Sequence, residues 1–294
     1  MRVDVALIYF LMRLVALLPL RAVHAVGAAF GALSWRVRGK ACRQAQANIA
    51  IARPGLAPEA RAALVREALL ASGRSMAEMA WIWGRDARDA LGRVREVRGQ
   101  ELFDAAVADP RGLIIAAPHL GCWELLNYWL CDHTDMAILY RPPRVAALEV
   151  LLRKVRGDLA PEQVRAEGAG VRTLYKRLKA GQTVGILPDQ KPRAGEGHIA
   201  PFFGRDALTM VLLPRLAART QATVLFAFAE RLPRGAGYRV HFVPAPEGMA
   251  DADLDVACRA LNLGVQQCVE RAFAQYQWSY RRFSGFGLEN PYNH

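Results

Sequence analysis

Two apolar blocks open the chain, at residues 3–20 and 22–35. The first contains an aspartate and an arginine, and neither is the uncharged span of about 20 residues that a transmembrane helix needs. A basic cluster follows directly and consists of Arg36, Arg38, Lys40 and Arg43. Apolar helices followed by such a cluster are typical of membrane anchors with the basic side in the cytoplasm. We therefore expect a membrane-associating helical segment over residues 1–44, and two buried helices of a soluble domain are the alternative.

The pattern then turns helical over residues 58–83, where Pro58 suits a first helical turn. From residue 94 onwards, short apolar runs alternate with helical patterns. We expect strands at residues 94–98, 112–117, 136–140, 183–187, 222–229 and 238–243. We expect helices between them, among others at residues 122–130, 146–156, 170–180, 208–220 and 252–276. This alternation predicts an α/β fold over residues 45–294, with a mixed, mostly parallel sheet flanked by helices.

Polar residues follow three of the predicted strands. His119 comes after the first of these, Arg141 after the second, and Asp189 with Gln190 after the third. Each could be structural by itself, as a turn cap or a solvated side chain. If the three strands are neighbours, however, their carboxyl ends meet at one edge of the sheet, where α/β folds place their sites.

Glu124 lies five positions after His119 and could be its partner. Positions five apart are about 140° apart around one helix, so the two can pair only if His119 lies in the turn before the helix. Gly121 would let the backbone bend there. A neutral imidazole can take a proton from a hydroxyl while a carboxylate on its other nitrogen fixes the tautomer. A structural histidine beside a surface glutamate is the alternative interpretation of this spacing. If Glu124 is structural, Asp189 is the next candidate to orient His119.

Composition narrows the class of partner. There are 39 Lys and Arg against 27 Asp and Glu, for a net charge of +12, which favours an anionic partner such as a phosphorylated substrate, an acidic membrane or an acidic carrier protein. The five cysteines show no C-x-x-C spacing, and their odd number argues against a disulfide framework. A catalytic domain that faces the reducing cytoplasm is the simplest interpretation.

Several other classes lack their motifs. A zinc hydrolase would need a spacing such as H-E-x-x-H, so we expect no metal site. A serine hydrolase would need a G-x-S-x-G elbow. A nucleic-acid-binding protein would explain the charge but not the apolar N-terminus, so we expect no nucleic acid partner. A non-catalytic membrane scaffold stays open, although His119 and Glu124 argue against it.

Six motifs occur in order along nearly the whole chain. They are Asn48 before Arg53-Pro54, His119-x4-Glu124, Tyr140-Arg141-Pro142, Leu187-Pro188-Asp189-Gln190, Pro201-Phe202-Phe203-Gly204, and Gln277-Trp278-x-Tyr280-Arg281-Arg282. With this set the chain resembles the bacterial lipid A biosynthesis (lauroyl/myristoyl) acyltransferases, within the lysophospholipid and glycerol-phosphate acyltransferase superfamily. The wider superfamily usually has aspartate at the position of Glu124, and the resemblance implies that both carboxylates serve in the lipid A branch.

The resemblance implies acyl transfer from an acyl carrier protein thioester to a hydroxyl of a lipid A precursor, without a cofactor. His119 would deprotonate the hydroxyl and Glu124 would orient His119, while Arg141 or amides near Gly121 would stabilise the oxyanion. The expected substrate-binding residues are Arg141, Arg144, Arg153, Asp189 and Gln190, since an anionic glycolipid needs basic contacts.

The same resemblance implies a place for the enzyme in the cell and a second partner. It implies an enzyme at the inner membrane, with its catalytic domain facing the cytoplasm. An acidic carrier protein could dock on the basic helix that contains Arg172, Lys176, Arg177 and Lys179. A lysophospholipid or another glycolipid as acceptor, or acyl-CoA as donor, is the alternative.

Overall fold

The computed structural model describes residues 3–140, 162–165, 168–193, 195–285 and 287–292, with the side chains of residues 3–7 left aside. Arg141, Arg144, Arg153 and the helix expected at residues 146–156 therefore lie outside the described residues.

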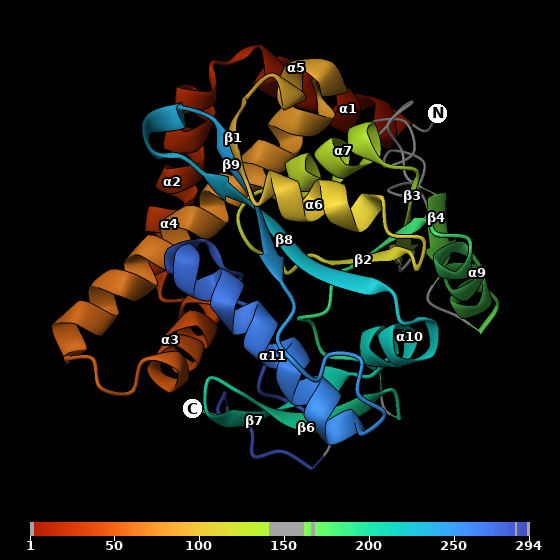
Figure 1. Ribbon diagram of the computed structural model, residues 1–294. Helices are drawn as coiled ribbons and strands as arrows, with labels where there is room; N and C mark the ends of the chain where they lie inside the picture. The colour runs from red at the N-terminus through yellow and green to blue at the C-terminus, as the bar shows by residue number, and fades with distance from the viewer. Residues whose placement is uncertain (1–2, 141–161, 166–167, 194, 286, 293–294) are drawn as a thin grey trace.

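Five helices form the N-terminal part of the molecule (Figure 1): α1 (Val3–Leu17), α2 (Leu20–Val37), α3 (Lys40–Ala52), α4 (Pro58–Trp83) and α5 (Ala87–Leu91). The backbones of α2 and α4 touch at glycines, and a Cβ on Gly27 would lie 2.6 Å from the carbonyl oxygen of Gly73. The expected division of the chain at residue 44 falls inside α3. Among the described helices, none combines the length and the apolar character that crossing a bilayer requires.

A seven-stranded sheet follows, in the order β1-β9-β8-β2-β5-β3-β4. Its strands are β1 (Val94–Arg98), β2 (Leu113–Ala116), β3 (Met136–Tyr140), β4 (Glu162–Arg165), β5 (Thr183–Ile186), β8 (Thr223–Arg231) and β9 (Tyr238–Pro244). The pairs of strands from β8 to β4 are all parallel, β9 is antiparallel to β8, and β1 is parallel to β9. The predicted mixed, mostly parallel sheet is therefore confirmed.

Helices cover both faces of the sheet, which is why β2 is buried along its whole length. In Figure 1, α6 and α7 lie above the sheet and α10 and α11 below it. The helices are α6 (Gln100–Val107), α7 (Trp123–His133), α9 (Gly168–Lys179), α10 (Leu212–Thr220) and α11 (Leu254–Arg271). Alternate residues of β2 enter the two cores, since Leu113 and Ile115 pack on the α6–α7 side and Ile114 and Ala116 on the α10–α11 side.

A small antiparallel hairpin, β6 (Gly197–Phe202) and β7 (Arg205–Met210), packs against α11. Two short 3-10 turns, η2 (Pro233–Gly235) and η3 (Phe273–Gln275), complete the described elements. The hairpin corrects one expectation. Residues 208–210 belong to β7 and pair with residues 197–199, so the helix expected from residue 208 begins at Leu212.

Candidate active site

Strand register brings His119 and Asp189 to the same height at the edge of the sheet. β2 and β5 are parallel neighbours, and Ala116 at the end of β2 is opposite Ile186 at the end of β5. His119 and Asp189 each come three residues later. Parallel strands carry equivalent positions to the same edge, so the two side chains meet there.

Asp189 contacts His119 through both of its carboxylate oxygens. Nδ1 of His119 lies 2.9 Å from Oδ1 of Asp189, and the backbone N–H of His119 donates to Oδ2 at 3.0 Å. Asp189 is buried, with 3% of its surface exposed. Burial by itself raises the pKa of Asp189, but the neighbouring His119 and the hydrogen bonds from its ring and backbone outweigh burial and lower the pKa below the ordinary value. Asp189 is therefore an ionised acceptor at neutral pH.

The other ring nitrogen of His119 faces Gln190. Nε2 lies 3.3 Å from the amide nitrogen of Gln190, which also donates to Oε1 of Gln277 at 3.1 Å. An amide N–H at Nε2 and a carboxylate at Nδ1 together assign the ring proton to Nδ1. Nε2 then carries the lone pair, which is the arrangement of a general base.

Glu124 lies in the first turn of α7 and His119 in the turn before it, as the spacing requires. The carboxylate at Nδ1 of His119 is nevertheless Asp189, while Oε2 of the buried Glu124 accepts a hydrogen bond from Nε1 of Trp83 at 3.0 Å. The expected pairing of His119 with Glu124 therefore differs from the contacts that the structure gives. The part that Glu124 plays in the reaction stays a prediction.

The turn that carries His119 is fixed by its backbone. Gly121 donates to the carbonyl oxygen of Gln275 at 3.2 Å, and Cys122 donates to that of Ala229 at 2.8 Å. Gly121 has a φ of 63°, and a Cβ there would collide with the carbonyl oxygen of Ala229. Only glycine fits this turn without strain. Both amides therefore already have backbone carbonyl partners.

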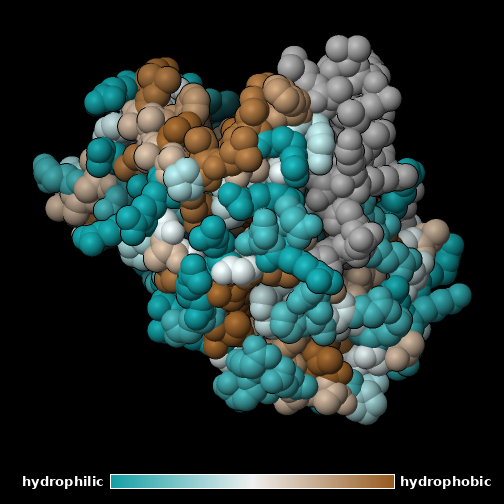
Figure 2. Space-filling model, turned by 90° about the horizontal axis from the view of Figure 1, so that it is seen from above, coloured by the Kyte–Doolittle hydropathy of each residue, from teal (hydrophilic) through white to brown (hydrophobic). Residues whose placement is uncertain are grey.

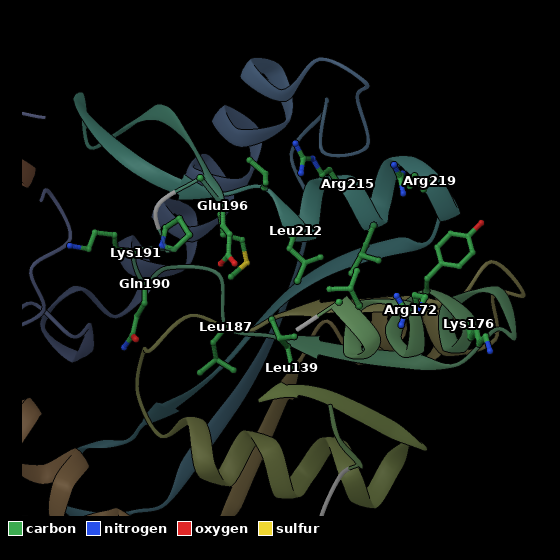
Figure 3. A pocket seen from close by; sticks show the side chains of 18 of the residues that line it. Leu139, Arg172, Lys176, Leu187, Gln190, Lys191, Glu196, Leu212, Arg215 and Arg219 are labelled. Atoms are coloured by element: carbon green, nitrogen blue, oxygen red, sulfur yellow. The ribbon is translucent and has the colours of Figure 1, made fainter. Parts of the chain in front are cut away.

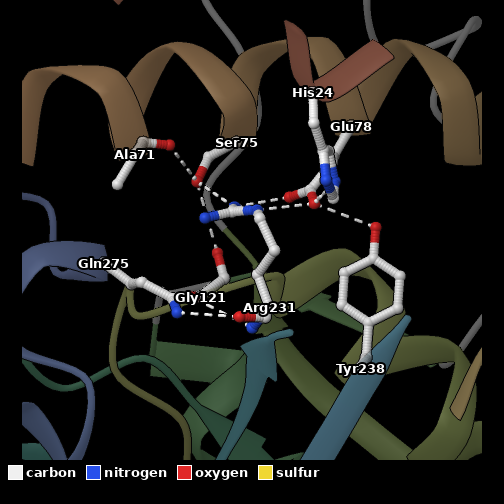
Figure 4. Close-up of polar contacts among 8 residues, drawn as sticks. All are labelled: His24, Ala71, Ser75, Glu78, Gly121, Arg231, Tyr238 and Gln275. Carbon is white, nitrogen blue, oxygen red and sulfur yellow. Dashed lines mark hydrogen bonds and ion pairs between the residues drawn. The ribbon is translucent and has the colours of Figure 1, made fainter. Parts of the chain in front are cut away.

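A buried polar network lies behind this turn (Figure 4). Nη2 of Arg231 donates to Oγ of Ser75 at 2.8 Å, and the single hydroxyl proton of Ser75 can go to the carbonyl oxygen of Ala71, at 3.2 Å, or of Gly121, at 3.4 Å. Nε of Arg231 donates to Glu78 at 2.6 Å, and His24 and Tyr238 contact the same carboxylate. Burial raises the pKa of Glu78, but the charge of Arg231 and the hydrogen bonds from His24 and Arg231 outweigh it and lower the pKa to about 2. The network thus anchors the His119 turn to α4.

The C-terminal motif closes the site from the other side. The backbone N–H of Lys191 donates to the hydroxyl of Tyr280 at 2.9 Å. The amide nitrogen of Asn48 donates to the carbonyl oxygens of Trp278, at 2.6 Å, and Tyr280, at 2.7 Å. Motifs more than 200 positions apart in the sequence therefore hold the loop after β5 in place.

A cavity of about 1280 Å³ opens beside His119 (Figure 3). Gln190 and Lys191 lie at one end, near His119, and basic side chains lie at the other. Between the two ends the lining is mostly apolar and includes Leu139, Leu187, Leu212 and Leu216, together with the carboxylate of Glu196. The basic end comes from α9 and α10 and consists of Arg172, Lys176, Arg215 and Arg219. The cavity can therefore take a molecule with an apolar chain and an anionic group.

Comparison with known proteins decides the family. The family model for bacterial lipid A biosynthesis acyltransferases matches residues 2–284. The chain belongs to this family. It is 24% identical to the lipid A biosynthesis lauroyltransferase of Escherichia coli strain K12, over 92% of this chain and 88% of that protein. It is 26% identical to the lipid A biosynthesis palmitoleoyltransferase of the same organism, over 81% of this chain and 77% of that protein.

A third relative acts on a different kind of lipid by its name. The phosphatidylinositol mannoside acyltransferase of Mycobacterium tuberculosis is 25% identical over 50% of this chain and 48% of that protein. Since all three relatives are acyltransferases, the present protein is an O-acyltransferase.

The acyltransferase brings only some of the expected residues together. His119, Asp189 and Gln190 form one cluster, and Glu124 lies in the adjacent helix. On α9, Arg172 and Lys176 line the cavity, whereas Arg177 pairs with Glu162 at 2.7 Å. Among the described residues, no three His, Cys, Asp or Glu side chains gather as a metal site would require.

Sequence reasoning missed the residues that support this cluster: Ser75, Glu78, Trp83, Arg231 and Gln275. They lie on α4, at the end of β8 and on η3, far from the His119 motif in sequence. The spacing around His119 gave no signal for them. Within α4, the one signal was Glu78, a carboxylate in the otherwise uncharged stretch of residues 75–83.

Proposed function

We propose that this acyltransferase moves a fatty acyl chain from an acyl carrier protein thioester to a hydroxyl of a lipid A precursor. The observation that carries the proposal is the position of His119, held by Asp189 at the mouth of a long apolar cavity with a basic end. Membership of the lipid A acyltransferase family supports the reaction type and the class of acceptor.

In the proposed reaction, Nε2 of His119 takes the proton of the acceptor hydroxyl while the oxygen attacks the thioester carbonyl. The Nδ1–H bond to Asp189 stabilises the positive ring that forms. The tetrahedral intermediate then collapses, the carbon–sulfur bond breaks, and the leaving thiolate takes the proton from Nε2. The products are the ester and the free thiol, so His119 returns to its starting state without a covalent acyl-enzyme.

Glu124 and Arg141 keep proposed roles beside this pair. Glu124 would help to orient His119 from the first turn of α7. The amides of Gly121 and Cys122 are already engaged, which leaves Arg141 as the proposed donor to the oxyanion. With Arg144 and Arg153, Arg141 is also a proposed contact for the acceptor's phosphates.

The cavity supports the proposed substrates by its two kinds of lining. The apolar stretch would hold the acyl chain, whose burial is worth about 0.8 kcal/mol per methylene. At the basic end, Arg215 and Arg219 would face the phosphorylated part of a substrate, and Arg172 and Lys176 would meet an acidic carrier protein. Arg177 is less suited to docking because Glu162 already neutralises it.

We further propose that α1 and α2 lie in the surface of the inner membrane, with the catalytic domain on the cytoplasmic side. Figure 2 views the molecule from the end at which α1, α2 and α5 lie in Figure 1, and hydrophobic side chains gather on that face. On α1 and α2 the exposed apolar side chains include Leu17, Phe30 and Val37, which are 77%, 66% and 69% exposed. Large exposed apolar side chains on amphipathic helices favour a membrane interface, and the net charge of +12 favours anionic lipid.

The second candidate is the same chemistry on another acceptor. The mycobacterial relative, which by its name acylates a phosphatidylinositol mannoside, matches half of the chain. A different glycolipid or a lysophospholipid, or acyl-CoA as donor, would use the same His119 and the same cavity.

The experiment supplies purified enzyme with acyl carrier protein or coenzyme A thioesters and with a lipid A precursor, a lysophospholipid or a phosphatidylinositol mannoside. Mass spectrometry follows the gain of one acyl chain. We expect transfer from the carrier thioester to the lipid A precursor, abolished by His119→Ala. Transfer to either other lipid without transfer to the lipid A precursor would overturn the proposed acceptor. Preference for the coenzyme A thioester would overturn the proposed donor.

A further inference from the structure

A second cavity, of about 770 Å³, lies between α2, α4, η2 and η3. Its lining residues differ from those given for the cavity beside His119. Arginines dominate it: Arg21, Arg66, Arg74, Arg231 and Arg234 line it together with the single carboxylate of Glu67. Leu70, Leu232 and Pro233 add an apolar wall. A cavity with this lining suits an anion that also carries a less polar part.

Arg66 and Arg74 are the two arginines of α4 that line this cavity. Arg231 is committed to Glu78 and Ser75. Within the part of the chain that the structure describes, no hydrogen bond or ion pair fixes the guanidinium groups of Arg66 and Arg74. Arg74 is half-buried, and its pKa is lowered mainly by burial and, to a smaller extent, by repulsion from Arg231. The carboxylates of Glu78 and Glu67 oppose this shift. A bound anion would relieve this repulsion.

The rim of the cavity is held in place before any ligand arrives. Nε of Arg21 donates to the carbonyl oxygen of Arg234 at 2.7 Å. Arg234 has a φ of 56°, which is uncommon for an arginine, and Gly235 packs so closely on Arg21 that a Cβ there would lie 2.6 Å from Cγ of Arg21. Strained backbone of this kind concentrates at functional sites.

We propose that this cavity binds the phosphate group of a sugar or glycerol phosphate, with Arg66 and Arg74 as its ligands. Planar guanidinium groups bind phosphate through paired hydrogen bonds. Arg231 and Gln275 line this cavity and also hold the turn that contains His119. A ligand in the cavity would therefore lie directly behind that turn. The site is distinct from the proposed acyl site and does not depend on the proposed reaction.

Calorimetric titration of the full-length enzyme with glucose 1-phosphate and with inorganic phosphate tests the site. The double variant Arg66→Gln/Arg74→Gln should weaken binding of glucose 1-phosphate at least about 10-fold, the loss expected for about 1.4 kcal/mol. Arg61→Gln, on the same helix but outside the cavity lining, is the matched control and should bind as wild type. His119→Ala should also bind as wild type, which separates this site from the acyl site.

A second arm distinguishes a soluble phosphate ester from a lipid headgroup. Wild type and the two arginine variants are sedimented with vesicles of phosphatidylcholine alone and with phosphatidylglycerol added. A loss of binding that is confined to the double variant supports the phosphate site. Loss in the calorimetric arm identifies a soluble phosphate ester as the ligand, and loss in the vesicle arm identifies a lipid headgroup. If the double variant and Arg61→Gln behave alike in both arms, or if wild type binds neither probe, the proposal is wrong. Thermal melting of the double variant close to that of wild type separates a loss of binding from misfolding.

Discussion

Asp189 does more for His119 than a single hydrogen bond would. Its two oxygens bind the ring and the backbone of the same residue, so they fix both the rotamer and the position of the turn. Asp189 is buried and ionised, and a carboxylate in this state holds an imidazole proton on one nitrogen. Nε2 is therefore left as the basic atom, on the side of the cavity.

Behind the turn, the ion pair of Glu78 and Arg231 is the most deeply buried one described. Glu78→Gln would leave the guanidinium of Arg231 buried without a counter-charge. Breaking a buried pair in this way costs about 3–5 kcal/mol, so we expect a loss of stability of this size in urea unfolding. Glu247→Gln, at an exposed loop position, is the control and should change stability by less than about 0.5 kcal/mol. Equal stability of the two variants would show that the pair does not anchor α4.

The same carboxylate makes stability depend on pH. The pKa of Glu78 is about 2 in the folded protein against 4.5 ordinarily, so its contribution is complete above about pH 4.5. It is lost as the pH falls from about 4.5 towards about 2. Urea unfolding at several pH values should show that the free energy of unfolding of wild type falls as the pH is lowered over this range. In Glu78→Gln the free energy of unfolding should fall less steeply. Parallel slopes would contradict the low pKa.

The sequence indicated which residues belong to the candidate site, but it did not indicate which carboxylate contacts His119. The three polar strand ends were visible because each follows an apolar run. The choice of Asp189 over Glu124 as the partner at Nδ1 depends on the register of β2 and β5, which pairs Ala116 with Ile186. A local spacing contains no information about a pairing between residues that are 70 positions apart.

At the scale of elements, the two apolar blocks of the N-terminus became α1 and α2, which break apart at Pro19. The alternating pattern after residue 94 correctly predicted the central strands because buried parallel strands are apolar on both faces. The hairpin β6–β7 was missed, since its apolar residues at 208–210 also fit a helical period. Residues 208–210 form a strand because they pair with residues 197–199, and a local sequence pattern does not reveal such a tertiary contact.

The contact between α2 and α4 depends on glycine. Gly27→Ala would place a methyl group 2.6 Å from the carbonyl oxygen of Gly73 and 2.7 Å from Cα of Arg74. The helices would have to separate, so we expect destabilisation of about 1–3 kcal/mol in urea unfolding, despite the better helix propensity of alanine. Gly55→Ala is the control, because its Cβ would meet nothing within 4 Å. A melting temperature of Gly27→Ala equal to that of the control would contradict the close approach.

The exposed apolar side chains of α2 are predicted to enter the membrane surface. Phe30→Asp together with Leu33→Asp should reduce sedimentation with anionic vesicles at least about 10-fold, since burial of two such side chains is worth about 3 kcal/mol or more. Leu263→Asp removes an exposed leucine of α11 and is the control. Unchanged sedimentation of the double variant in high salt would mean that another face of the molecule binds lipid.

At the scale of the whole molecule, the carboxyl edge of the sheet organises both cavities. β2 and β5 bring His119 and Asp189 to the cavity beside His119, and the adjacent parallel strand β8 ends at Arg231, which lines the second cavity. The surplus of basic residues is thus concentrated in part around two separate cavities. The sequence predicted an anionic partner from the charge, but it could not predict two separate cavities, because that requires knowing where the strands end in space.

The central claim is that His119 and Asp189 act as one unit in acyl transfer, and steady-state kinetics of single and double variants test it most directly. Asp189→Asn should lower kcat at least about 100-fold with little change in KM or melting temperature, because general base catalysis supplies about 10²–10⁴-fold. In the His119→Ala background, Asp189→Asn should add almost nothing, since residues that work as one unit are not additive. Glu124→Gln, measured in both backgrounds, tests in the same way whether Glu124 also acts through His119. If folded Asp189→Asn turned over at the wild-type rate while Glu124→Gln lost activity as His119→Ala does, Asp189 would not be the group that orients the base, and the account would be wrong.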